Sequence, residues 1–113
     1  MKSIKQEKSK KFAVRIVNLC KFLNGKKEFV MSNQILRSGI SIGANLAEAE
    51  FAQSKDDFIH KITIALKEAS ETNYWLELLY QTDHLDKEQF SSLEADCSEI
   101  ISILVAALNS LKN

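Results

Sequence analysis

The feature that most limits the folds open to this chain is its lack of chain-breaking residues: it has no proline and only three glycines among 113 residues. Proline interrupts helices, and glycine is a common residue of tight turns. A chain with so few of both has few places to turn, so we expect long helices joined by short connections. Its hydrophobic content of 45% and charged content of 27% are typical of a soluble globular protein. At this length we expect one domain that spans residues 1–113.

The stretch from residue 37 to residue 79 predicts two of these helices, joined by a turn near Gln53. Ser54 is a good N-cap residue, and Asp57, three positions later, suits the reciprocal bond of a capping box. After this cap, apolar or small residues recur in alternating steps of four and three: Phe58, Ile62, Ala65, Ala69, Thr72, Leu76 and Leu79. This spacing is that of one helix face, and it predicts a helix over residues 55–81.

Similar periodicity elsewhere raises the number of expected helices to four. The expected ranges are 3–23, 27–52 and 55–81, with a last helix that begins after a cap formed by Asp86 and Gln89. Gly25 follows the first helix and is expected to adopt the left-handed conformation that ends a helix. Short connections place consecutive helices antiparallel and side by side. The predicted fold is therefore all-α, an antiparallel up-down-up-down four-helix bundle.

The helix expected over 27–52 has more apolar surface than contact with a single core requires. One apolar seam consists of Phe29, Leu36, Ile40, Gly43 and Ala47, and a second consists of Ile35, Ile42 and Leu46. Two seams indicate burial on more than one side of a helix. The helix over 55–81 carries a similar surplus, so we expect the chain to form a closed homo-oligomer.

Two glycines, Gly39 and Gly43, lie one turn apart on the same face of the 27–52 helix. A glycine inside a helix costs up to about 1 kcal/mol relative to alanine. Two on one face therefore indicate that another backbone comes close there. We interpret them as a site of close helix packing, with ligand binding as the alternative.

A polar stripe lies beside this glycine face. If the helices over 27–52 and 55–81 form a hairpin, residue 37 comes level with residues 69–71, and Arg37 is expected to pair with Glu68 or Glu71. The stripe and its expected partners are Arg37, Ser41, Asn45, Glu48, Glu68 and Glu71. We interpret it as a structural polar network or a subunit contact, with a binding groove as the alternative.

The net charge is zero, but the charges are unevenly distributed. Residues 1–27 hold nine basic groups and one acidic group, whereas the rest of the chain holds six basic and fourteen acidic groups. In the first helix, Lys8, Lys11 and Arg15 share one face, with Lys5 next to them. A cationic helix face is suited to phosphate contact. We interpret these four residues as a candidate nucleic-acid-binding face, with a merely solvated segment as the alternative.

The sequence offers little for catalysis or metal binding. With only two cysteines, which are expected to be small buried hydrophobes, we expect no zinc site, and the two Glu-x-x-His motifs that a di-iron bundle needs are missing. Neither a nucleophile motif nor a phosphate-binding loop is present. We expect no enzymatic activity, no cofactor and no metal. Without a signal peptide or an apolar stretch of about 18 residues, a cytoplasmic location away from membranes is expected.

Three segments resemble the bacterial four helix bundle protein family: RSGISIGANLAEA (37–49), AQSKDDFIHK (52–61) and ALKEASETNYWLELL (65–79). Its members are also described as proteins encoded by intervening sequences of large-subunit ribosomal RNA. The resemblance implies a four-helix bundle that assembles as a homopentamer, with no assigned catalytic residues. The family is similar to the accessory variability proteins of diversity-generating retroelements, which are basic pentamers that bind nucleic acid and a reverse transcriptase.

Two functions compete on this information. An oligomer that gathers several copies of the basic first helix at one rim is suited to bind structured RNA or an RNA–protein complex. Alternatively, the oligomer is a protein-interaction scaffold that does not touch nucleic acid. The family context and the basic first helix favour RNA, whereas overall neutrality favours the scaffold.

Overall fold

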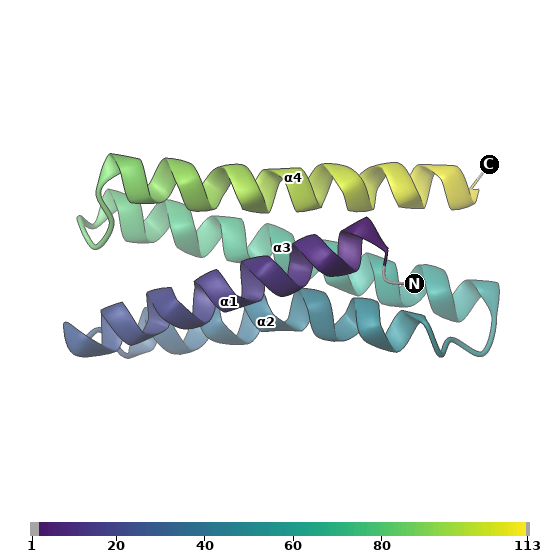
Figure 1. Cartoon of the computed structure of the whole chain (residues 1–113), viewed down its shortest axis with the longest axis horizontal. Coiled ribbons are helices and arrows are strands. Elements are labelled where there is room, and N and C mark those ends of the chain that lie inside the picture. Colours follow the sequence, from purple (N-terminus) through teal and green to yellow (C-terminus); the bar gives the residue numbers. More distant parts are fainter. Residues whose placement is uncertain (1–2, 113) are drawn as a thin grey trace.

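The computed structural model describes residues 3–112 and contains four long helices (Figure 1). They are α1 (Ile4–Gly25), α2 (Val30–Ala49), α3 (Lys55–Gln81) and α4 (Lys87–Lys112). Successive helices run in opposite directions along the long axis (Figure 1). Each helix contacts its neighbours in the chain, and α4 also meets α1. The predicted antiparallel four-helix bundle is confirmed.

Side-chain caps fix the starts of three helices. Ser54 Oγ accepts the Asp57 N–H at 3.0 Å at the start of α3. Before α4, Asp86 Oδ1 accepts the Gln89 N–H at 2.7 Å, and Gln89 Oε1 accepts the Asp86 N–H at 3.0 Å. A capping box of the same kind joins Ser3 and Gln6 before α1. These bonds satisfy backbone donors that have no partner within a helix, so they define where each helix begins.

The connection between α1 and α2 differs from the expectation. Gly25 is the last helical residue and does not have a positive φ; the left-handed residue is Lys27, with φ 63°. The N-cap position of α2 is Phe29, which offers no side-chain acceptor, and α2 starts three residues later than expected. The carboxylate of Glu28 instead accepts the Met31 N–H at 3.1 Å. A carboxylate at a helix start also interacts favourably with the helix dipole.

The core is built from one apolar stripe of each helix. Residues with 0% exposure include Ile16 and Leu23 of α1, Ile35 and Ile42 of α2, Ile62, Leu76 and Leu79 of α3, and Leu104 of α4. A Cβ atom added at Gly39 would lie 2.8 Å from Ile16 Cγ2, so α1 and α2 approach closely at this point. At Gly43 the nearest atom would be Ser9 Cβ at 3.6 Å, which is ordinary contact. Close packing therefore requires glycine at position 39 but not at position 43.

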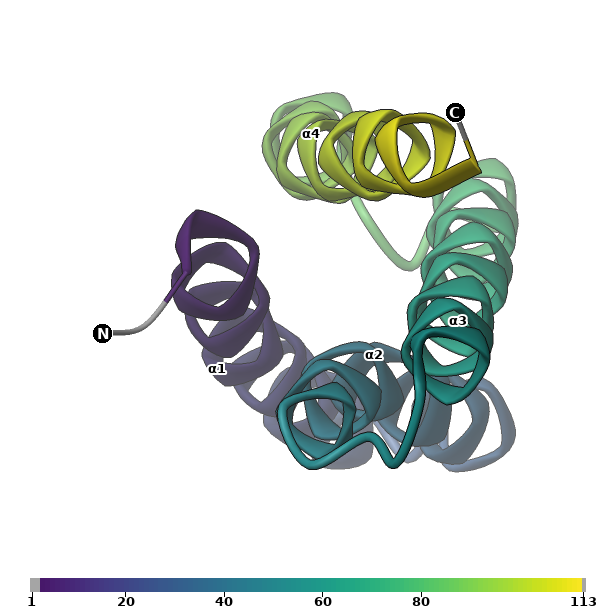
Figure 2. The same ribbon diagram turned by 90° about the vertical axis from the view of Figure 1, so that its right-hand side faces the viewer.

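The four helices do not close evenly around this core. The contacts between α1 and α4 are the least extensive of the four neighbouring pairs. α1 begins well short of the end of the bundle that holds the α2–α3 connection and the carboxyl end of α4 (Figure 1). Seen along the bundle, the amino end of α1 and the carboxyl end of α4 are set apart, whereas α2 lies directly beside α3 (Figure 2). One side of the bundle is thus much more open than the others.

The two apolar seams of α2 have different environments. The seam with Ile35, Ile42 and Leu46 is buried in the core. The other is largely exposed, with Phe29 at 53% and Ile40 at 43%. Its exposed members are the surplus that the sequence indicates, whereas Leu36 packs against the core and Gly43 lies beside Ser9 of α1.

No helix in the described part of the chain is both long and apolar enough to span a bilayer.

Candidate functional site

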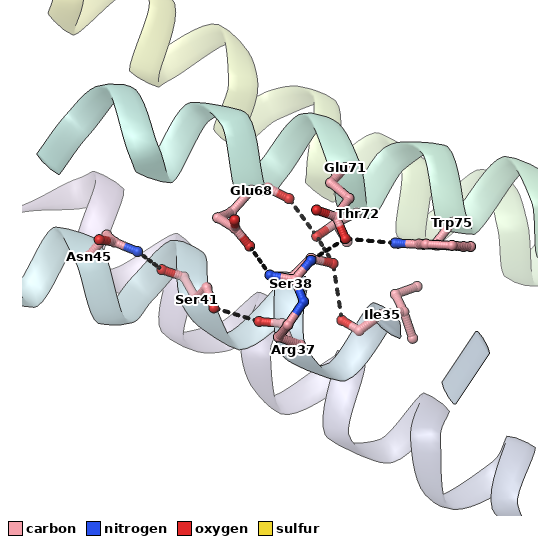
Figure 3. Close-up of polar contacts among 9 residues, drawn as sticks. All are labelled: Ile35, Arg37, Ser38, Ser41, Asn45, Glu68, Glu71, Thr72 and Trp75. Atoms are coloured by element: carbon pink, nitrogen blue, oxygen red, sulfur yellow. Dashed lines mark hydrogen bonds and ion pairs between the residues drawn. The ribbon is translucent and has the colours of Figure 1, made fainter. Parts of the chain in front are cut away.

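The polar residues between α2 and α3 form a connected cluster, here called the α2–α3 polar cluster (Figure 3). Its members are Arg37, Ser38, Glu68, Glu71, Thr72 and Trp75. The Arg37 guanidinium donates to Glu68 Oε2 at 3.0 Å and, through its other terminal nitrogen, to Glu71. The indole N–H of Trp75 donates to the same Glu71 oxygen at 2.9 Å. Arg37 therefore bridges two carboxylates of α3 one turn apart.

The electrostatics of this cluster are those of a stable ion pair. The Trp75 N–H and the Arg37 guanidinium lower the pKa of Glu71, in that order of importance. The bond to Glu71 raises the pKa of Arg37. Both groups thus stay charged across the neutral range, and neither is poised to exchange a proton. The arrangement is suited to fix how α2 and α3 align, but not to acid–base chemistry.

Beneath the ion pair lies a buried hydroxyl pair that the sequence pattern does not reveal. Thr72 Oγ1 lies 2.8 Å from Ser38 Oγ, and both residues are 0% exposed. Ser38 also lies within hydrogen-bond distance of the Ile35 carbonyl, at 3.4 Å. Thr72 occupies a position in the apolar stripe of α3, so spacing alone assigns it to the core. Its hydroxyl was the one available signal that the stripe contains a polar contact.

The remaining residues of the predicted stripe behave differently from one another. Ser41 Oγ donates to the Arg37 carbonyl at 2.6 Å, and Asn45 Nδ2 donates to the Ser41 carbonyl at 2.8 Å. Both bonds stay within α2. Glu48 accepts from Lys61 Nζ of α3 at 2.9 Å, and this bond raises the pKa of Lys61. The structure therefore links α2 to α3 through Arg37 and Glu48, but not through Ser41 or Asn45.

The basic residues predicted on α1 divide into two pairs. Lys8 Nζ lies 2.9 Å from Glu99 Oε1, and Arg15 Nη1 lies 2.6 Å from Asp96 Oδ2. Arg15 also donates to Ser92 Oγ at 2.9 Å. These contacts hold α1 to α4. Lys5 and Lys11 form no ion pair within residues 3–112, so only these two of the four predicted phosphate contacts are free of an acidic partner there.

A groove of about 670 Å³ lies between α1 and α2 and is here called the α1–α2 groove. Its apolar walls are exposed side chains, with Val14 at 55%, Val17 at 37% and Ile40 at 43%. Lys10 and Lys21 of α1 line it as well, and neither forms an ion pair within the described chain. The sequence indicates an excess apolar seam on α2. It does not show that α1 lies beside this seam and forms the other wall of a groove.

The described residues offer no evident reaction centre. Cys20 and Cys97 are buried, and each Sγ lies within hydrogen-bond distance of a backbone carbonyl, that of Ser32 and of Ala69. Burial, with help from Glu94, raises the pKa of Cys97 to about 12, which keeps this thiol protonated and unreactive. Within residues 3–112, no three His, Cys, Asp or Glu side chains gather in a way that could hold a metal ion.

Comparison with known proteins places this bundle in a family. The family model described as 23S rRNA-intervening sequence protein matches residues 2–106. Among solved structures, the chain is similar to a crystal structure from Bacteroides thetaiotaomicron, described as a protein with unknown function from the S23 ribosomal protein family. The two chains are 59% identical, with 93% of this chain and 98% of that one covered and a TM-score of 0.91. None of the curated proteins matches this chain.

Proposed function

The chain belongs to the 23S rRNA-intervening sequence protein family, and from this premise we propose that it is a non-enzymatic homo-oligomer that binds structured RNA or an RNA–protein complex. Binding occurs through lysines of α1 and of the residues directly after it. The binding residues are the lysines of this segment that have no acidic partner. Of the four residues expected from the sequence, Lys5 and Lys11 belong to this set. Lys8 and Arg15 serve mainly to hold α1 against α4.

One observation carries the proposal: the acidic residues of α4 neutralise only part of the charge of α1. Two basic side chains pair with Glu99 and Asp96. Six further lysines form no ion pair within residues 3–112: Lys5, Lys10, Lys11, Lys21, Lys26 and Lys27. Unpaired lysines along one helix gain favourable free energy from phosphates through counterion release.

Homo-oligomerisation would multiply this weak attraction. A single copy offers a few exposed lysines in an otherwise acidic protein. Several copies held in one assembly bind one RNA with an avidity well above that of each copy, without any new kind of contact. A structured RNA offers phosphates on several sides, so it suits such a multivalent rim better than a short single strand does.

The test is binding of a fluorescent RNA hairpin to the native chain over a KCl series. The variant replaces Lys5, Lys11 and Lys26 by glutamine, which removes three charges from α1 and its C-cap residue and keeps helix propensity. Native binding is expected to weaken steeply with salt. The variant is expected to bind more weakly, and its log–log salt slope should be shallower by about one for each phosphate that it no longer neutralises.

A matched control removes the same charge elsewhere. Lys55, Lys67 and Lys87 are exposed, lie on α3 and α4, and form no ion pair within residues 3–112. Their glutamine variant changes the net charge equally and is expected to keep the native salt slope. If both variants lose affinity equally, the effect is one of net charge and the α1 site is wrong. Absence of native binding at low salt would remove the RNA function altogether.

The second candidate is a protein scaffold that does not contact nucleic acid. The α1–α2 groove favours it, because an exposed apolar groove is typical of a protein-binding surface. The same salt series separates the two functions. A scaffold predicts no hairpin binding by the native chain, whereas the RNA function predicts binding that the α1 lysines control.

A further inference from the structure

We propose that the α1–α2 groove binds a helix of a second copy of this chain, and that this helix is α4, docked through its outward face. The inference rests on the homo-oligomeric state proposed above and assigns its two contact surfaces. The contact is heterologous, since the groove of one copy receives a different surface of the next. It takes Lys10 and Lys21 out of the six unpaired lysines, because they line the groove, and leaves Lys5, Lys11 and Lys26 available to RNA.

The walls of the groove have the spacing that receives a helix. On α1, Lys10, Val14, Val17 and Lys21 follow one another in steps of four, three and four. On α2, Ile40, Ala44 and Ala47 continue the pattern in steps of four and three. Such steps keep side chains on one face of a helix, as in the seam of a coiled coil. Two antiparallel helices with these seams side by side form a groove into which a third helix can pack.

The base of the groove permits a close approach. Gly43 has no side chain, those of Ala44 and Ala47 are small, and Ser9, at the base, is fully buried. The Ser9 hydroxyl has no hydrogen-bond partner in the described chain. A helix with small residues on its contacting face can therefore pack closely here, because small residues on both sides allow interaxial distances near the lower end of about 8–10 Å.

The outward face of α4 has this character. Its exposed residues lie at steps of three and four, with a glutamate at each end of a run of small side chains: Glu88, Ser91, Ala95 and Glu99. Further along the helix the same face continues with Ser102 and Ala106, both exposed. From residue 100 to residue 111 the helix has no charged residue at all. A helix that lacks charge on every side for this length is usually covered by protein.

The two lysines of the groove match two glutamates of α4 in charge and spacing, and Glu50 of the groove lining stands outside this match. Lys10 and Lys21 of the groove are eleven residues apart, as are Glu88 and Glu99 of α4. At 1.5 Å per residue, both pairs span about 16 Å. Opposite charges can therefore meet at both ends while Val14 and Val17 face the small residues between the glutamates. Glu99 bonds to Lys8 of its own copy through Oε1 and is exposed, so it remains accessible to a second lysine.

The first arm of the test is cross-linking of the oligomer with a short bis-maleimide. Two double variants are compared, Val14→Cys with Ala95→Cys and Val17→Cys with Ala95→Cys, on denaturing gels. If α4 runs antiparallel to α1 of the next copy, position 14 faces position 95; if it runs parallel, position 17 does. The variant that matches the direction of α4 is expected to give a ladder of covalent multimers, as a heterologous contact requires. The matched control, Val14→Cys with Lys67→Cys, places the second thiol on α3 and is expected to give none.

The second arm reverses the charges on one side of the contact at a time and follows the mass of the oligomer by light scattering. Lys10→Glu with Lys21→Glu places like charges opposite each other, and so does Glu88→Lys with Glu99→Lys. Each variant alone is expected to self-associate at least about tenfold more weakly than the native chain. In a mixture, opposite charges meet at every contact between the two unlike variants, so much of the association is expected to return.

The outcomes separate the two proposals. If the native chain is a monomer at micromolar concentration, the homo-oligomeric state and this interface are both wrong. If the native chain is an oligomer but neither cysteine pair cross-links and mixing restores nothing, only the interface is overturned. Cross-linking by one pair together with recovery in the mixture supports it, whatever the result of the RNA experiment.

Discussion

The contact between α2 and α3 and the contact between α4 and α1 are built from different interactions. α2 and α3 share a buried hydroxyl pair, Ser38 and Thr72, beneath the ion pairs of Arg37. α1 and α4 are joined by ion pairs of half-exposed or exposed side chains, and their contact is the least extensive in the bundle. Exposed ion pairs contribute little free energy, whereas buried packing and satisfied buried polar groups contribute much more. The bundle is thus firm on one side and loosely joined on the other.

The largest effect is expected from breaking the core of α3. Leu76 is 0% exposed, and Leu76→Asn would bury an amide among apolar side chains. We expect a loss of about 4 kcal/mol in the free energy of unfolding, measured by circular dichroism in urea. The control is Ser70→Asn on the exposed face of the same helix, with an expected change within about 0.5 kcal/mol. Equal losses in the two variants would show that Leu76 is not a core residue.

The hydroxyl pair tests how firmly α2 is joined to α3. Thr72→Val keeps the shape of the side chain and replaces its hydroxyl by a methyl group. It is expected to lower the free energy of unfolding by about 1 kcal/mol. Ser38→Ala alone should cost a similar amount. In each single variant the remaining hydroxyl still lies within hydrogen-bond distance of a backbone carbonyl, that of Ile35 for Ser38 and that of Glu68 for Thr72. The loss in the double variant is therefore expected to be only about 0.5 kcal/mol smaller than the sum of the single losses. Strict additivity in this double-mutant cycle would mean that the two hydroxyls do not interact.

The pH dependence of stability sharpens the comparison on the same side. The pKa of Glu71 is lower in the folded chain than in the unfolded chain. The ionised carboxylate therefore contributes to the free energy of unfolding above its unfolded pKa of about 4.3, and this contribution disappears as pH falls through the folded pKa. Glu71 is partly exposed, so we expect the free energy of unfolding of the native protein to exceed that of the Glu71→Gln variant by only about 0.5 kcal/mol at pH 7. The difference should vanish in acid. A difference that persists unchanged at pH 2 would contradict the assignment.

The smallest effect is expected on the open side of the bundle. Arg15→Gln removes the ion pair with Asp96, and both side chains are more than a third exposed. We expect a loss of about 0.5 kcal/mol at low salt that disappears in 1 M NaCl, where the screening length falls to about 3 Å. Thr72→Val provides the contrast, because the cost of its uncharged contact should not depend on salt. A salt-independent loss for Arg15→Gln would mean that this side is held by packing.

Local signals explain what the sequence could predict. The helix range 55–81 and the caps at Ser54 and Asp86 are read from residues within one turn of each other. The pairing of Arg37 with α3 follows from counting along a hairpin with a short turn. The start of α2 was misplaced because its cap comes from the Glu28 carboxylate and not from a typical N-cap residue.

Long-range alignment explains what the sequence could not predict. Whether Lys8 and Arg15 meet phosphates or carboxylates depends on how α1 and α4 lie against each other, although the paired residues are 91 and 81 positions apart in the chain. No local pattern fixes that alignment, so half of the predicted basic face turned out to bond within the chain. The exposure of Ile40 has a similar origin, because the periodicity that marks an apolar seam is the same whether the seam faces a core or a partner.

The two buried cysteines provide a native thiol on each of α1 and α4, the two neighbouring helices with the least extensive contact. Cys20 lies on α1 and Cys97 on α4, and burial raises the pKa of both thiols. A thiol reagent can reach either one only after the surrounding structure opens, so its labelling rate measures an opening equilibrium of that helix. Because the thiols are on different helices, their rates need not agree. The wild-type chain therefore contains the means to ask whether α1 separates from the bundle before the whole molecule unfolds.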